Sequence, residues 1–139
     1  MCLEIAVFSS CHPRFLRLFR TYGTVTKTGI QQWNILCRWA LCISLRQPTP
    51  PTLIDAPADS NVEMTWQTFG GEAHELFLAV LKERCVRDGL GCSDEVVGKQ
   101  FRLHLHRGLS YLATPHAIRS IADLVKNAIA SEDGSRGEK

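Results

Sequence analysis

Residues 71–87 read GEAHELFLAVLKERCVR, and this stretch decides the fold class. Its apolar residues recur every three or four positions, which places their side chains on one face of an α-helix. The charged residues lie mostly on the other faces. Asp88-Gly89 follows, and glycine readily adopts the left-handed conformation that ends helices. The stretch therefore predicts an amphipathic helix that ends near Arg87.

A second helix is expected to begin after Ser93, which can cap it, with Asp94 and Glu95 in the first turn where the helix dipole favours acids. Its body leaves an alternative open. The apolar residues of 100–106 alternate with basic ones, so this segment fits a strand as well as a helix. We prefer a helix because the segment continues from a good cap, although Gly98 inside it weakens a helix by about 1 kcal/mol relative to alanine.

A last helix is expected from Thr114-Pro115, read as cap and first-turn proline, to Ala130. We therefore predict a mainly α protein with a small three- or four-helix domain over residues 66–130, in the C-terminal half, packed as an antiparallel bundle. The polar tail 131–139 is expected to be disordered. The predicted core contains Phe77, Val80, Leu81, Val97, Phe101, Ile118, Ile121 and Val125.

Before this domain the composition changes twice. Residues 47–65 hold four of the six prolines, so we expect an extended linker there. Residues 1–46 form a basic segment, and through residue 53 six bases face a single acid. Within the segment we expect a strand at 3–8, a cationic amphipathic helix at 13–20 and a helix at 30–45.

Four interpretations of the basic segment 1–46 stay open. Its arginines, spaced along an amphipathic stretch poor in acids, are typical of an organelle transit peptide or a segment lying on an anionic membrane. Alternatively it packs against the C-terminal helices, or it contributes little and the functional domain begins at Met64. The apolar run at 35–45 is too short for a transmembrane helix, which needs about 20 residues.

The six cysteines are not preceded by a secretory signal, so we expect reduced thiols in an intracellular protein. The location would be cytoplasmic, or organellar if the basic segment is a transit peptide. A net charge of +2 excludes a strongly basic protein of the kind that binds nucleic acid without specificity.

Four residues have the right chemistry for a small zinc site: Cys85, Cys92, His104 and His106. The gap between the cysteines is longer than in zinc fingers, which favours core cysteines and surface histidines instead, with no cofactor. The same histidines could activate Cys92 or Ser93 as a nucleophile, but no catalytic motif surrounds them, so no catalytic residue is assigned.

A second candidate site is a basic stretch near Phe101 and Tyr111. Cations contact phosphates and aromatic rings stack on bases, so the stretch is a candidate nucleic-acid surface, although a solvated helix face would look the same. Its residues are Lys99, Arg102, His104, His106 and Arg107.

The function favoured by these observations is a non-enzymatic protein-interaction or regulatory module. A helical domain of about 65 residues has a thin core, which favours stabilisation by a protein partner or by self-association. The first alternative is a nucleic-acid-binding regulator that uses residues 99–107. The second is a small zinc-binding protein or a thiol enzyme.

Overall fold

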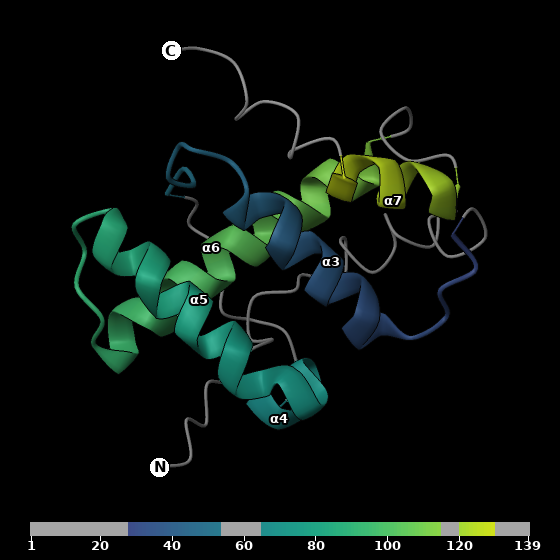
Figure 1. The fold of residues 1–139 in the computed structure, drawn as a ribbon. Helices are drawn as coiled ribbons and strands as arrows, with labels where there is room; N and C mark the ends of the chain where they lie inside the picture. Colours follow the sequence, from purple (N-terminus) through teal and green to yellow (C-terminus); the bar gives the residue numbers. More distant parts are fainter. Residues whose placement is uncertain (1–27, 54–64, 115–119, 130–139) are drawn as a thin grey trace, which may run out of the picture.

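The structure, a computed structural model, describes residues 28–53, 65–114 and 120–129, and these residues form helices and connecting segments without a strand. Figure 1 shows α3 and α5 lying against a long α6, with α4 at the beginning of α5. The mainly α prediction is confirmed. The elements are α3 (Trp33–Leu45), α4 (Trp66–Gly70), the 3-10 helix η1 (Gly71–Ala73), α5 (His74–Arg87), α6 (Asp94–Ala113) and α7 (Ile121–Ile129).

Helix α5 ends where the sequence predicts. Gly89 has a φ of 75°, the left-handed conformation that glycine adopts without strain. The amides of Gly89 and Leu90 donate to the carbonyls of Val86 and Cys85 at 3.0 and 2.9 Å. This pair of hydrogen bonds is the Schellman motif, which satisfies carbonyls that the helix end would leave unpaired.

Helix α6 is continuous through residues 100–106, so the helical alternative is confirmed. Ser93 caps it by accepting a hydrogen bond from the amide of Val96 at 3.4 Å. The alternating pattern arises because α6 is covered on more than one side: Phe101 and Leu105 share one face, and Leu103 on the opposite side is buried as well. A central helix thus imitates the two-residue period of a strand.

Helix α3 belongs to the core. Its residues Leu36, Cys37, Ala40 and Leu41 are fully buried, in one cluster with residues of α5 and α6. The core therefore includes residues well before residue 66, where the predicted helical domain begins. Residues 33–45 take part in this core, because the apolar face of α3 covers α6.

The contact between α3 and α6 depends on one glycine. A Cβ atom added to Gly108 would lie 1.8 Å from the carbonyl oxygen of Ala40, far inside van der Waals contact. The two backbones can approach this closely because neither residue carries a large side chain at the crossing.

An aromatic cluster closes the core between α4, α5 and α6. The ring centroid of Phe69 lies 4.9 Å from that of Phe101, 5.2 Å from that of Trp66 and 5.7 Å from that of Phe77. The Trp66 indole donates to the carbonyl of His74 at 2.9 Å, so its one polar atom is satisfied. Thr65 caps α4 by accepting from the amide of Thr68 at 3.2 Å.

The last helix differs from its prediction. Thr114 ends α6 rather than opening α7, and α7 begins at Ile121 with Ser120 donating its amide to Asp123 at 3.1 Å. Leu124 of α7 is buried, whereas the predicted core residues Ile121 and Val125 are exposed, as is Val80 of α5. The predicted faces of these two helices were therefore wrong by part of a turn.

Several expectations lie outside the described residues: the strand at 3–8, the helix at 13–20, the transit peptide, Ile118 and the disordered tail. Residues 47–53 of the predicted linker are described and hold no regular helix or strand. No helix in the described part of the chain is long and apolar enough to cross a membrane.

Candidate functional site

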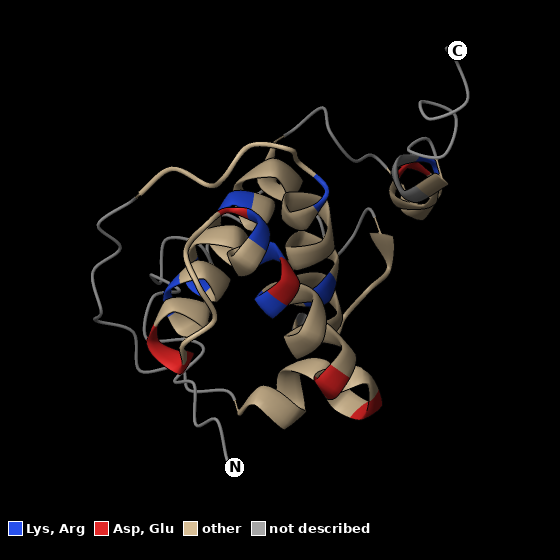
Figure 2. Cartoon of the chain, turned by 60° about the vertical axis from the view of Figure 1, so that its left-hand side comes forward, with Lys and Arg blue, Asp and Glu red and all other residues tan. Residues whose placement is uncertain are grey.

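The predicted basic stretch of α6 divides between two sides of the helix. Lys99 is exposed, Arg102 and His106 are half-buried, and their spacing of three and four residues places them along one line. His104 lies on a different side of α6 from these three residues and is fully buried in the core. Figure 2 shows basic and acidic segments interspersed over the described helices. The five residues therefore do not form a single basic surface.

Burial also changes the charge of the two histidines. The pKa of His104 is lowered to about 4 by burial, with Arg107 and Arg84 adding repulsion, and burial lowers the pKa of His106 as well. Both imidazoles are therefore neutral at pH 7. The cations of the stretch are Lys99, Arg102 and Arg107.

Arg107 is held against the end of α3. Its Nε donates to the Ser44 hydroxyl at 2.8 Å, its Nη2 to the Ser44 carbonyl at 2.6 Å, and its Nη1 to the Thr49 carbonyl at 2.8 Å. Three hydrogen bonds to two residues fix the plane of the guanidinium. Burial and the neighbouring Arg84 lower the pKa of Arg107.

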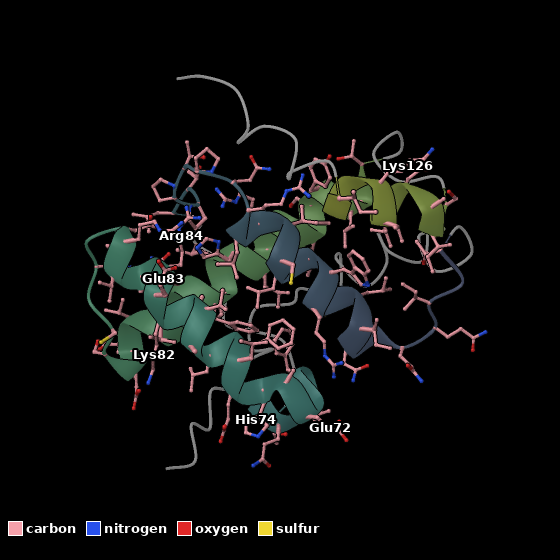
Figure 3. The ribbon with its side chains drawn as sticks, viewed as in Figure 1. Glu72, His74, Lys82, Glu83, Arg84 and Lys126 are labelled. Atoms are coloured by element: carbon pink, nitrogen blue, oxygen red, sulfur yellow. The ribbon has the colours of Figure 1, made fainter. Side chains whose placement is uncertain are left out.

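Arg84 of α5 binds the same segment from the other side. It is almost completely buried, and its guanidinium donates to the carbonyls of Leu45, Gln47 and Thr49 at 2.8, 2.7 and 3.0 Å. Its Nε pairs with Asp88 at 2.9 Å. Figure 3 shows Arg84 reaching toward the segment that follows α3. Two arginines therefore fix the first residues of the predicted linker.

Ser44 and His104 form a buried pair, with the hydroxyl oxygen 3.0 Å from the imidazole Nδ1. A serine beside a neutral imidazole has the composition of an activated nucleophile. Ser44 is only 1% exposed, however, and the Nε2 of His104 is buried with no hydrogen-bond partner that could orient the ring. The pair instead fixes the Ser44 hydroxyl that receives Arg107.

The proposed nucleophiles are far from both histidines. Cys92 and Ser93 precede α6, and His104 lies ten residues beyond its first residue, a rise of about 15 Å along the axis. Neither histidine can reach them. Cys85 is buried, and burial with the nearby Asp88 raises the pKa of its thiol, which keeps it protonated and unreactive.

The predicted zinc ligands are separated for the same reason. Cys92 lies before α6, His104 is in the core and His106 is on another side of the helix. Among the described residues no three His, Cys, Asp or Glu side chains are grouped so as to hold a metal ion.

Comparison with known proteins adds what the geometry alone does not supply. The model of one protein family, described as DNA sulphur modification protein DndE, matches residues 25–120. The chain belongs to the DndE family. The match contains α3, α4, α5 and α6 entirely, including every residue that contacts Arg84 and Arg107. No curated protein and no solved structure matches the chain.

Membership of the DndE family corrects the favoured function. We expected a generic protein-interaction or regulatory module, and this was wrong: the family is described by DNA sulphur modification. The expectation rested on the absence of a catalytic motif and on a thin core, and neither observation carries information about DNA. Helicity and small size were predicted correctly, whereas nucleic acid was named only in the first alternative and sulphur modification of DNA was not predicted.

Sequence reasoning also missed part of the hydrogen-bonded group beside α6, which we call the polar layer: Ser44, Arg84, Asp88, His104 and Arg107. Ser44 and Arg84 were not singled out, because each looked like an ordinary helix residue, and Asp88 was interpreted only as part of the stop after the helix. One signal was present: Arg84 interrupts the apolar face of α5, between Leu81 and Cys85, where a charge must find buried partners.

Proposed function

We propose that this protein is a DNA-contacting component of a DNA sulphur-modification system. The observation that carries the proposal is the match to the DndE family over residues 25–120, which contain α3 to α6. The proposal makes DNA the nucleic-acid partner, and other proteins of the same system the protein partners. It also implies action inside the cell, where the DNA is.

The surface proposed to face DNA is the solvent-exposed side of α6, through Lys99 and Arg102. These cations lie three residues apart on one line of the helix, and Lys99 is exposed. Asp94 and Glu95 stand at the beginning of the same helix, so they limit contact with phosphates to the part of α6 beyond its first turn. Such a surface supports modest, salt-dependent binding.

The test of the biological role is deletion of the gene in its own organism. Phosphorothioate linkages in nuclease-digested DNA are measured by mass spectrometry, with and without a plasmid copy of the gene. We expect sulphur to disappear from the DNA on deletion and to return with the plasmid. Unchanged sulphur content after deletion would contradict the proposal.

The test of DNA contact uses the purified full chain and a fluorescent duplex. Changing both Lys99 and Arg102 to glutamine is expected to weaken binding and to reduce the slope of log K against log salt by about 0.9 for each phosphate that the variant no longer neutralises. The matched control is Arg87→Gln on α5, where the arginine already pairs with Glu83 at 2.8 Å. Equal binding by both variants would rule out the α6 surface.

A further inference from the structure

A cavity of about 410 Å³ lies beside the C-terminal half of α6, between that helix and the segment that follows α3. Residues that carry hydroxyl groups line it on both sides. Ser44, near the end of α3, and Thr49 line one side, and Ser110 and Tyr111 of α6, with Thr114 just after it, line the other. The one ionisable cation in its wall is Arg107, and no carboxylate is among its described lining residues.

The guanidinium of Arg107 is already positioned for a ligand. Its three hydrogen bonds to Ser44 and Thr49 use three of the five N–H groups of an arginine, and leave one on each terminal nitrogen. Phosphate oxygens are strong acceptors for guanidinium donors of this kind. Since the side chain is held in place before binding, little conformational entropy is lost when the ligand arrives.

The charge of the surroundings favours an anion. Arg107 is the charged residue in the cavity lining, and the positive charge of the nearby Arg84 is offset by its partner Asp88. The phosphodiester of a DNA backbone carries one negative charge per phosphate group, which Arg107 can offset.

We infer that this cavity binds one phosphate group of a DNA backbone, with Arg107 contacting two of its oxygens and the hydroxyls of Ser110 and Tyr111 available to the others. The inference rests on the proposed function, that the protein contacts DNA. It adds a specific anchoring site, distinct from the Lys99 and Arg102 line. Arg107 follows Lys99 by eight residues, about 12 Å along the helix and about 80° around it, so one strand that crosses α6 obliquely can reach both places.

The test measures binding of a fluorescent DNA duplex by the full chain across a series of salt concentrations. Loss of a charge-assisted hydrogen-bond pair in Arg107→Gln is expected to weaken binding by roughly ten- to a hundredfold. The slope of log K against log salt should also fall by about 0.9. Arg87→Gln, which removes the same charge from an exposed site, should stay within about twofold of the natural protein.

Arg107 also fixes the backbone after α3, so its variant could lose stability. Thermal unfolding followed by circular dichroism shows whether a variant is destabilised. If Arg107→Gln is, Tyr111→Phe tests the cavity instead, because it removes a single hydroxyl from a side chain that is 43% exposed. We expect severalfold weaker binding with an unchanged salt slope. If the natural protein binds DNA but both variants bind equally well, the phosphate site is wrong and the proposed function stands. If the natural protein itself binds no DNA, the proposed contact with DNA is wrong, and the phosphate site is wrong with it.

Discussion

At the scale of single residues, the burial of His104 makes the stability of the protein depend on pH. His104 is fully buried and faces Arg107 and Arg84, with Asp88 as the one nearby acid. Its folded pKa of about 4 lies below the ordinary value of 6.5. Between these values the unfolded chain binds a proton that the folded chain does not. The stability that neutral His104 contributes is therefore fully present above pH 6.5. The free energy of unfolding falls by about 3 kcal/mol as the pH drops to 4.

This dependence is measurable by urea unfolding at pH 7 and at pH 4.5. In His104→Asn the amide can still meet the Ser44 hydroxyl but cannot titrate. The variant should be less stable at pH 7, because it fills less of the core, yet lose less stability on acidification than the natural protein. An unchanged loss in the variant would show that another group causes it.

Arg84 and Arg87 offer a matched comparison of a buried and an exposed arginine on one helix. Each pairs with an acid four residues away, at 2.9 and 2.8 Å, but only Arg84 also donates to four carbonyls at the end of α3 and just after it. Lysine cannot reproduce the planar fork of donors. We expect Arg84→Lys to lower the free energy of unfolding by about 2–3 kcal/mol. Arg87→Lys should change it by less than about 0.5 kcal/mol. Similar losses in denaturant unfolding would contradict the role of the buried network.

At the scale of elements, the crossing of α3 and α6 is the most sensitive contact in the described fold. Gly108 meets the Ala40 backbone at a distance that no Cβ can occupy. Gly108→Ala should therefore force the helices apart and destabilise the protein by about 3 kcal/mol or more, although alanine is the better helix former.

The control for this change lies two residues away. Ser110 is exposed on the same helix, and Ser110→Ala should be neutral or slightly stabilising because alanine favours the helix. Thermal unfolding followed by circular dichroism compares the two variants. A Gly108→Ala protein as stable as the natural one would mean that the helices can move apart at no cost.

Some helices could be predicted from the sequence and others could not, because some depend on local contacts and others on distant ones. The end of α5 and the start of α6 were predictable, because Gly89 and Ser93 act through local backbone hydrogen bonds. The role of α3 was not, because its partner α6 follows some fifty residues later and local patterning carries no such information. His104 looked like a surface base for a similar reason: its burial depends on Ser44, sixty residues earlier.

For the whole molecule, the decisive point is that the core is built from both sides of the proline-rich segment. The family match begins at residue 25, before α3, which agrees with a functional unit that includes this helix. Function could not be read from the chain because the candidate DNA surface consists of a few cations among acids, and the cavity at Arg107 is assembled from segments sixty residues apart. Neither the surface nor the cavity produces a recognisable sequence motif.

This organisation predicts that a chain starting at Met64 does not fold. Without α3, the buried side of α6 that meets Leu36 and Leu41 faces water, and each leucine contributes about 1.5–3 kcal/mol when buried. We expect the shortened chain to keep some helical signal in circular dichroism but to unfold without a cooperative transition. A synthetic peptide of residues 28–53, added in trans, should restore the transition, and the same peptide with Leu41→Asp should not. A cooperative transition in the shortened chain alone would show that the C-terminal helices form an independent domain, so that α3 covers a core which is already complete.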